Sequence, residues 1–374
     1  MSNYDSFDLT YITIDSLSEG VGSSQITPLI SRLSNSGLKI CLISFEKQAT
    51  SNELKNRILS LGVEWKLQSF GSSGLLGGLN RFSRLRRIIP KTNLIHARSD
   101  IPTVAGISSD QAPVLWDVRS LWSDQRLLIG TDGWNSLTAR GARTLEDIAA
   151  KKSTAMSTLT AAVVPFLEQR HKRIPKIREV IPTCVQTSKF VHSPMPDGQI
   201  TCLLSGTFNN YYDIDRTRQI LEEIRKTVNL RTIWARANES SMEKLGVGED
   251  IIVSATHSEM PNLVKQSHFG IAICKQDNLD SLAAAVPTKI GEFLASGRPV
   301  IVSDGIGDLD QMLTNSQTGI VINHRDSLET IAEQIILLLS DPETPNRCRE
   351  HAMQHFDMDK SVDKYLKIYD RMQQ

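Results

Sequence analysis

A lysine and a glutamate three residues apart carry the clearest chemical signal in this sequence. Lys289 and Glu292 lie in the segment PTKIGEFLASGRPVIV, residues 287–302. Its first proline suits the start of a helix, and its later glycine and proline end one. We therefore expect a helix over about residues 287–296, followed by a buried strand. At this spacing the two charged side chains share one face of the helix.

Two interpretations of this pair are open from the spacing alone. The residues could form an ordinary exposed ion pair, which would contribute roughly a few tenths of a kcal/mol. Alternatively, Lys289 and the amides of the helix N-terminus bind an anion such as a phosphate, while Glu292 accepts hydrogen bonds from hydroxyl groups one turn further along.

The overall composition argues against several other classes of function. The chain has 374 residues, enough for two domains, and its 42 basic and 42 acidic residues give a net charge of zero. A role in binding nucleic acid therefore has no electrostatic support. The five cysteines have no paired spacing, which is typical of a reduced cytosolic chain and not of a disulfide framework or a zinc site.

The N-terminal sequence and the hydropathy bear on location. The opening residues, MSNYDSFDL, carry acidic groups where a signal peptide has basic ones. Apolar runs fall short of the ~18 residues that a membrane-spanning helix needs. We expect a cytoplasmic protein that is attached, at most, to the inner face of the cell membrane.

Strand and helix patterns alternate along the whole chain, which is typical of parallel sheets covered by helices on both faces. A segment rich in proline, serine and glycine, residues 181–198, interrupts the alternation and predicts a connection between two domains. The expected strands are residues 9–14, 39–45, 93–96, 114–117, 161–164 and 179–181 before this connection, and residues 200–206, 231–237, 250–255, 269–274, 299–304 and 318–322 after it.

This alternation predicts an α/β fold with two Rossmann-like domains facing each other across a cleft. Ligands of such sheets bind beyond the carboxyl ends of the strands, so we expect the functional site there. The expected boundaries are residues 1–183 for the N-terminal domain, 184–198 for the linker, 199–356 for the C-terminal domain and 357–374 for a helix that packs back toward the N-terminal domain.

Five stretches follow one another in the order found in a known family: LSEGVGSSQITPLISRLSNSGLKICLISFEK (17–47), IHARSDIPTVAG (95–106), WDVRSLWSDQR (116–126), IPTCVQTSKF (181–190) and PTKIGEFLASGRPVIVSDGIGDLD (287–310). Together they resemble the retaining GT-B glycosyltransferases of family 4, also called group 1. The resemblance implies transfer of a sugar from a UDP- or GDP-linked donor to a hydroxyl of a glycan, a glycolipid or a small-molecule acceptor. It implies no separate cofactor and no metal ion, with the donor on the C-terminal domain and the acceptor mainly on the N-terminal domain.

The resemblance assigns roles in the donor site. Lys289 would contact the diphosphate and Glu292 the ribose hydroxyls, and Arg236 is the best second cation, with an ordinary surface arginine as the alternative. The family's commonest donor motif has another glutamate, and Ala284 stands at that position here. Ser281 and nearby backbone amides are then the groups available to contact the donor sugar. The other expected donor-binding residues are Thr288, Gly206 and Gly22.

Polar pairs at positions i and i+2 close two expected strands of the N-terminal half. Asp117 and Arg119 point to one side of their strand, as do His96 and Arg98 of theirs. With Lys289, we expect Asp117, Arg119 and His96 to be catalytic, and Asp117 would align the acceptor hydroxyl or take its proton. A structural salt bridge and a satisfied core histidine are the alternatives. The expected acceptor-side residues are Ser24, Gln25, Arg98, Trp122 and Asp124.

Two basic clusters could dock the protein on an anionic membrane that carries a lipid-linked acceptor. They are LNRFSRLRRIIPK, residues 79–91, and QRHKRIPKIR, residues 169–178. Apolar residues between the arginines of the first cluster suit a membrane surface. A solvated amphipathic helix packed on its own domain explains both clusters equally well.

Two other functions compete with glycosyl transfer. A catalytically silent subunit on the same scaffold would bind a partner, and Ala284 is its one supporting feature. A sugar-nucleotide epimerase on this scaffold would convert its substrate without an acceptor. Release of nucleoside diphosphate, with transfer of the sugar to an acceptor or to water, distinguishes a transferase from both.

Overall fold

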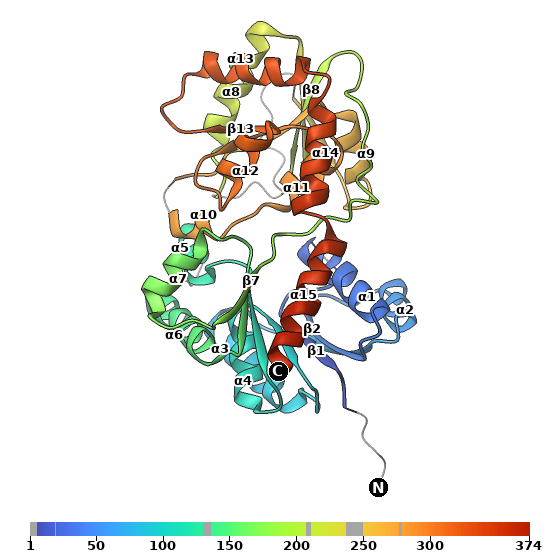
Figure 1. Cartoon of the computed structure of the whole chain (residues 1–374), viewed down its shortest axis with the longest axis vertical. Helices are drawn as coiled ribbons and strands as arrows, with labels where there is room; N and C mark the ends of the chain where they lie inside the picture. The colour runs from blue at the N-terminus through green and yellow to red at the C-terminus, as the bar shows by residue number, and fades with distance from the viewer. Residues whose placement is uncertain (1–5, 19, 130–135, 207–210, 237–249, 277–278) are drawn as a thin grey trace. The chain divides into compact units, whose positions relative to one another are not determined.

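The structure is a computed structural model that describes residues 6–18, 20–129, 136–206, 211–236, 250–276 and 279–374. The chain divides into two compact units (Figure 1). Unit 1 comprises Met1–Ile181 together with Asp359–Gln374, and unit 2 comprises Pro182–Met358. Each unit is built around one parallel sheet.

Unit 1 contains a sheet with the strand order β3-β2-β1-β4-β5-β6-β7 among the described residues. The central strands β1 and β4 are neighbours although two strands separate them in sequence, so their connections leave in opposite directions. Such a switch point is where ligands of parallel sheets bind. The strands are β1 (Leu9–Ile12), β2 (Ile40–Glu46), β3 (Glu64–Ser69), β4 (Ile95–Arg98), β5 (Val114–Val118), β6 (Ala155–Thr158) and β7 (Ile177–Val180).

Helices cover both faces of this sheet. The chain begins its helical part with a π-helical turn, and its final helix returns from unit 2 to pack in unit 1. The helices are η1 (Gly22–Ile26), α1 (Thr27–Asn35), α2 (Asn52–Ser60), α3 (Gly74–Ile88), α4 (Asp100–Ser109), α5 (Trp122–Ile129), α6 (Ser136–Lys152), α7 (Val163–His171) and α15 (Met358–Gln373).

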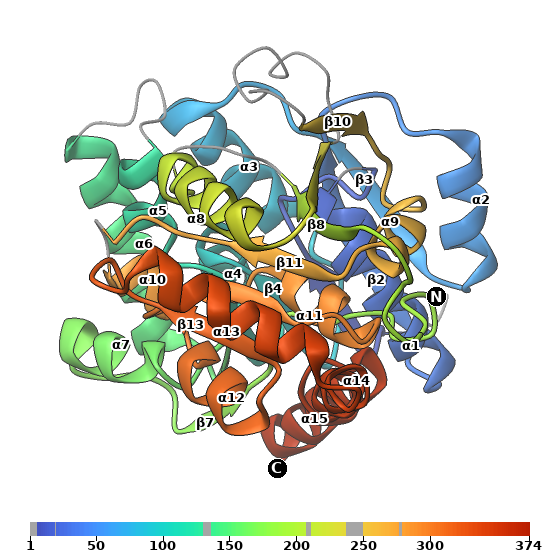
Figure 2. The same ribbon diagram turned by 90° about the horizontal axis from the view of Figure 1, so that it is seen from above.

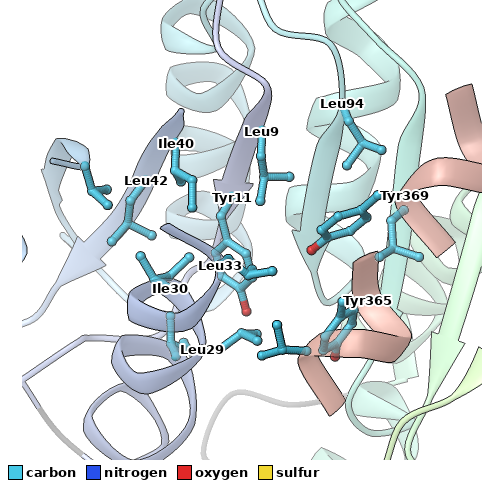
Figure 3. Close-up of a cluster of buried hydrophobic side chains, with 14 of the residues drawn as sticks. Leu9, Tyr11, Leu29, Ile30, Leu33, Ile40, Leu42, Leu94, Tyr365 and Tyr369 are labelled. Carbon is cyan, nitrogen blue, oxygen red and sulfur yellow. The ribbon is translucent and has the colours of Figure 1, made fainter. Parts of the chain in front are cut away.

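The two faces of the first sheet have separate cores because side chains alternate along each strand. Ile12 and Ile95 belong to the face that also receives Leu85 of α3. The opposite face carries Leu9, Tyr11 and Leu115, together with residues of α1 and α15. Figure 3 shows Tyr365 and Tyr369 of α15 on the same side of the sheet as Tyr11.

Unit 2 contains a sheet with the strand order β10-β9-β8-β11-β12-β13 among the described residues, with its switch point between β8 and β11. Its strands are β8 (Ile200–Ser205), β9 (Leu230–Arg236), β10 (Ile251–Ser254), β11 (Phe269–Ala272), β12 (Val300–Ser303) and β13 (Gly319–Ile322). Its helices are α8 (Ile214–Thr227), α9 (Met260–Gln266), α10 (Leu279–Ala283), α11 (Thr288–Ala295), α12 (Leu309–Ser316), α13 (Leu328–Ser340) and α14 (Thr344–His355).

The helix α11 packs unusually close to the second sheet. A methyl group placed on Gly270 of β11 would come within 2.4 Å of the Phe293 ring, so only glycine permits this approach. Phe269 and Ile271, the neighbours of Gly270, point to the opposite face, where α8 and α13 lie side by side (Figure 2). The face that holds α11 is therefore opposite to the face covered by α8 and α13.

The predicted pair of α/β units with parallel sheets is confirmed, and two expectations for individual strands need correction. The expected strand at residues 161–164 is wrong, because this segment is a turn and the start of α7, while the strand is β6, residues 155–158. The strand β3 was not expected, because it lies at the edge of the sheet and consists of exposed and half-buried residues, most of them polar. The five cysteines are buried and form no disulfide bond. Across the described residues, no helix is long and apolar enough to cross a membrane.

Candidate active-site residues in the two units

Lys289 lies at the switch point of the second sheet. The helix α11 begins after Pro287, whose backbone is extended, and the carbonyl of Val286 accepts a hydrogen bond of 2.7 Å from Thr183 Oγ1. This contact fixes the start of the helix. Lys289, in the first turn, is 9% exposed. A methyl group placed on Gly206, just after β8, would come within 3.3 Å of Lys289 Nζ.

The ammonium group of Lys289 has an aromatic neighbour. Its Nζ lies 4.3 Å from the centroid of the Tyr212 ring, which is a cation–π contact. Burial raises the pKa of Cys274 to about 12, and the nearby charge of Lys289 opposes this rise. Lys289 is therefore surrounded by residues that follow β8 and β11, the two strands at the switch point.

Glu292 is a buried carboxyl group one turn beyond Lys289. It is 8% exposed, and burial raises its pKa to about 7 while the charge of Lys289 opposes the rise. Within the described part of the chain, its carboxylate has no hydrogen-bond or ion-pair partner. A carboxylate of this kind is available to accept hydrogen bonds from a ligand. The geometry thus departs from the exposed ion pair that the spacing left open.

The other expected donor-binding residues of unit 2 lie around the same edge. Thr288 is the first residue of α11, and Gly206 has φ of 104°, a conformation that favours glycine. Ser281 of α10 is buried beside Tyr211. Arg236 is the last residue of β9, and its side chain lies outside the described part of the chain.

In unit 1, the expected catalytic residues His96 and Asp117 belong to a buried polar network. His96 is fully buried, with Nδ1 at 2.6 Å from the Tyr369 hydroxyl and Nε2 at 3.2 Å from Asp117 Oδ2. Burial lowers the pKa of His96, although Asp117 opposes the shift. The neutral tautomer with its proton on Nε2 places that proton on the side of Asp117 and lets Nδ1 accept from the Tyr369 hydroxyl.

Asp117 is the centre of this network. Its carboxylate accepts hydrogen bonds from Arg119 Nε at 2.7 Å and from Ser157 Oγ at 2.7 Å. Arg98 lies further away, with Nη1 at 3.8 Å, and also contacts Asp15 at 3.0 Å. Burial alone would raise the pKa of Asp117, but Arg119 and the other partners outweigh it and hold the pKa well below its usual range.

These contacts match the structural salt bridge that the sequence left open for Asp117. A carboxylate with such a low pKa is a poor proton acceptor, so the expectation that Asp117 takes the acceptor proton does not fit this arrangement. Arg119 also donates to the hydroxyl of Tyr365 in α15. The network therefore joins the ends of β4 and β5 to α15. The burial of His96 fits the core histidine that was the alternative to a catalytic role.

Two of the expected acceptor-side residues, Trp122 and Asp124, belong to the helix α5. Asp124 is 4% exposed and pairs with Arg143 and Arg170 at 2.9 Å each, so it joins α5 to α6 and α7. Trp122 is the first residue of α5. Asp124 is thus engaged in a structural ion-pair network, which the sequence did not indicate.

The small residues at the start of η1, which were expected to contact the donor or the acceptor, contact the backbone of their own loop. A methyl group on Gly22 would come within 1.9 Å of the Ser16 carbonyl oxygen, so the glycine accommodates the chain's own backbone. Ser24 Oγ donates to the carbonyl of Gly20 at 2.9 Å, and Gln25 is buried. Small residues here serve the folding of the loop itself.

Sequence reasoning missed Glu46, the residue that holds this loop. Glu46 ends β2, is 4% exposed and accepts hydrogen bonds from Ser16 Oγ at 2.5 Å and from the Leu17 amide at 3.0 Å. Ser18 and Ser44 donate to it as well. Burial opposes ionisation, but these bonds outweigh it and lower the pKa of Glu46. The available signal was a lone carboxylate ending a strongly apolar strand.

The chain is similar to known proteins both in sequence and in structure. Residues 188–355 match the family model described as "Glycosyl transferases group 1". No curated protein matches the sequence. Sucrose-phosphate synthase from Thermosynechococcus elongatus is similar at 12% identity and a TM-score of 0.72, over 97% of this chain and 98% of that one. Anabaena HepE is similar in complex with UDP (12% identity, TM-score 0.69, 97% and 100% covered) and with UDP-glucose (11%, 0.65, 96% and 99%).

These similarities show that the chain has the GT-B fold, as predicted. The match to the glycosyl transferases group 1 model covers almost all of unit 2. The sequence identities are low, so the solved structures establish the fold and leave the substrates to be inferred from the residues of the site.

Proposed function

We propose that this protein is a retaining glycosyltransferase that moves a sugar from a UDP- or GDP-linked donor to a hydroxyl acceptor. The observation that carries the proposal is Glu292, a buried carboxylate without a protein partner among the described residues, one turn from Lys289. A nucleoside diphosphate offers both groups that this pair needs, a phosphate for the ammonium and ribose hydroxyls for the carboxylate. The group 1 domain and the nucleotides bound to HepE support the same assignment.

In this proposal the donor site is the switch point of the second sheet. Lys289 and the first amides of α11, including that of Thr288, stabilise the charge that develops on the leaving diphosphate. Gly206 and Ser281 border the same site, and Arg236 contributes a second positive charge. The protein itself supplies this stabilisation, so the reaction needs no metal ion or separate cofactor.

The transfer step exchanges one bond for another at the sugar. The bond from the anomeric carbon to the diphosphate oxygen breaks, and the acceptor oxygen bonds to the same face of that carbon, which retains the configuration. Because Asp117 is held ionised by its partners, we assign the acceptor proton to the leaving phosphate oxygen. His96, Arg98 and Arg119 then shape the acceptor side of unit 1, together with Ser24 and Gln25, while Gly22 of the same loop keeps its predicted place on the donor side.

A panel of nucleotide sugars tests the donor site directly. UDP-glucose, GDP-mannose and related compounds are added to the purified protein, and the specific donor should raise the melting temperature. Lys289→Ala should abolish this shift, whereas Lys226→Ala, a control on α8 whose side chain is 69% exposed, should retain it. If no nucleotide sugar raises the melting temperature, the proposal is wrong.

Product analysis then separates the transferase from its two competitors. A transferase releases nucleoside diphosphate as it transfers the sugar to an acceptor or, slowly, to water. A silent subunit binds the donor and releases nothing, and the product of an epimerase is again a nucleotide sugar, with no net release of nucleoside diphosphate. Nuclear magnetic resonance of the anomeric proton follows all three outcomes in one sample.

We also propose that the exposed side of α3 contacts an anionic membrane that presents the acceptor. Leu76 and Leu79 are 78% and 56% exposed, and Arg86 and Arg87 continue the exposed side of this helix, which contains no acidic residue. Apolar side chains can enter the lipid while the arginines meet its headgroups. In the second basic cluster, Arg170 and His171 are engaged with Glu146, which weakens its part in such a surface.

Flotation with vesicles tests this contact. The protein should float with vesicles of phosphatidylglycerol and phosphatidylcholine, and float less when the vesicles contain phosphatidylcholine alone. Replacing Leu76 and Leu79 with serine should reduce the bound fraction, whereas replacing the exposed Leu59 of α2, which is 64% exposed, should not. Equal binding of all variants would contradict a role for α3.

A further inference from the structure

A short strap of backbone, residues 211–213, crosses the end of β11 beside Lys289. Tyr212 forms an antiparallel bridge with Cys274. The amide of Asp213 donates to the Ile273 carbonyl at 2.9 Å, and the amide of Lys275 donates to the Tyr211 carbonyl at 3.1 Å. The backbone of residues 211–213 is therefore fixed to the sheet at its switch point.

The side chains of this strap are also held in place. Tyr211 is 7% exposed, and its ring meets the Tyr212 ring edge-on, with centroids 5.8 Å apart and an interplanar angle of 80°. Edge-to-face pairs of this kind are a preferred arrangement of aromatic side chains. The Tyr212 ring thus presents a fixed face, and this is the face over which Lys289 Nζ lies at 4.3 Å.

Lys289 needs such a support because a lysine side chain is flexible. Its ammonium group sits at the end of four methylene groups, and ordering these on ligand binding lowers affinity. The ring attracts the ammonium group electrostatically and restricts it to the side of Gly206. The lysine is therefore ordered before a ligand arrives.

We propose that Tyr212 is a positioning residue that acts through Lys289 on the diphosphate of the donor. This inference rests on the function proposed above and adds a residue that neither the sequence pattern nor the comparisons assign. Tyr212 influences the phosphate end of the nucleotide and leaves the recognition of base and ribose to other groups. Its effect is consequently limited to ligands that carry phosphates.

The first experiment measures the affinity of UDP and of uridine by calorimetry and by competition, with GDP and guanosine in their place if the donor panel selects GDP. Tyr212→Leu should weaken binding of the diphosphate by about three- to thirtyfold, the range of a partly buried cation–π contact. Tyr212→Phe keeps the aromatic face and should bind within about twofold of the wild type. Affinity for the nucleoside should stay unchanged in both variants.

A double-mutant cycle shows whether Tyr212 acts through Lys289. In a Lys289→Ala background, Tyr212→Leu should have no further effect on diphosphate affinity. Weaker binding in that background, or an equal loss of affinity for the nucleoside, would mean that Tyr212 supports the site in some other way, and the inference would be overturned.

A series of fluorinated phenylalanines at position 212 covers the case in which Tyr212→Leu fails to fold. Fluorine withdraws charge from the ring face without changing its shape much, so diphosphate affinity should fall stepwise with each fluorine added. If diphosphate affinity stays the same across the series, the inference is wrong. If the wild type binds the diphosphate and Lys289→Ala does not, a flat series leaves the proposed function standing, whereas absence of any nucleotide binding removes the proposed function first.

Discussion

The polar centres of the two units differ in how their charges are satisfied. In unit 1, Asp117 is surrounded by Arg119, His96 and Ser157, so the protein itself compensates its charge. In unit 2, Glu292 is 8% exposed, compared with 1% for Asp117, and no described residue gives its carboxylate a hydrogen bond. Buried charges of the first kind maintain structure, and those of the second kind are suited to a ligand. Burial and sequence motif alone would not distinguish them.

The comparison predicts opposite responses to mutation. Changes in the network around Asp117 should act mainly on the stability of unit 1. Changes at Lys289 and Glu292 should act mainly on ligand affinity and leave stability nearly unchanged. Variants that break this division would show that one of the two centres has been misassigned.

The largest effect is expected for Asp117→Ala. This change leaves the buried guanidinium of Arg119 and the nearby Arg98 without their common partner, and breaking a buried ion pair from one side costs about 3–5 kcal/mol. Urea denaturation followed by circular dichroism should show this loss. Glu292→Gln should change the free energy of unfolding by less than about 1 kcal/mol, and a similar loss in both variants would remove the contrast between the units.

The next effect concerns Glu46→Gln in unit 1. The amide cannot accept all of the hydrogen bonds that the carboxylate accepts, so we expect a loss of about 1–3 kcal/mol. Glu64→Gln on β3 is the matched control, because that side chain is 53% exposed.

The pH dependence sharpens this prediction. The pKa of Glu46 in the folded protein lies below its ordinary value of 4.5, so its ionisation stabilises the fold above that pH. This contribution is lost as the pH falls through the lowered pKa. The difference between wild type and Glu46→Gln should therefore shrink in acid, and a difference independent of pH would point to packing instead.

A third prediction concerns donor affinity and pH in unit 2. Hydroxyl groups bind the ionised form of Glu292, whose pKa is raised to about 7. Affinity for the nucleotide sugar should increase about tenfold between pH 6 and pH 8 and then level off, a change of about 1.4 kcal/mol. UDP-glucose is a better probe than UDP, because its phosphates do not titrate in this range. Glu292→Gln should bind more weakly and without this pH dependence.

The smallest effect is expected for a pair of tyrosines in unit 1. The Tyr11 hydroxyl is buried and has no hydrogen-bond partner among the described residues, whereas the Tyr369 hydroxyl contacts His96 at 2.6 Å. Tyr11→Phe should therefore stabilise the protein by about 0.5–1 kcal/mol, and Tyr369→Phe should destabilise it by a similar amount. Thermal melting of the two variants side by side gives the comparison.

The architecture could largely be predicted from the sequence because alternating apolar strands and punctuated helices are local signals. The segment around Lys289 is an example, since proline and glycine mark the ends of α11 within a residue or two. The strand predicted at residues 161–164 was wrong because a short apolar run fits either a strand or the start of a buried helix. In the structure the Val163 amide donates to Thr160 Oγ1 at 3.3 Å, which favours the helical start.

The site was harder to predict because its contacts join distant parts of the chain. The i, i+2 spacing indicated that Asp117 and Arg119 would pair, and they do. Nothing local indicated that Tyr365, 248 residues after Asp117, would join them. The ion pairs of Asp124 with Arg143 and Arg170 are long-range as well, 19 and 46 residues apart. Which polar residues face a ligand and which face each other is thus decided by tertiary structure.

The return of α15 to unit 1 has a consequence for biosynthesis. Tyr365 and Tyr369 fill the core of a unit whose sheet is complete once β7 has been made, long before α15 leaves the ribosome. During translation the part of this face that α15 covers must stay exposed while all of unit 2 is synthesised. A stop codon before Met358 would consequently leave unit 2 with its own core intact and harm the unit that was made first.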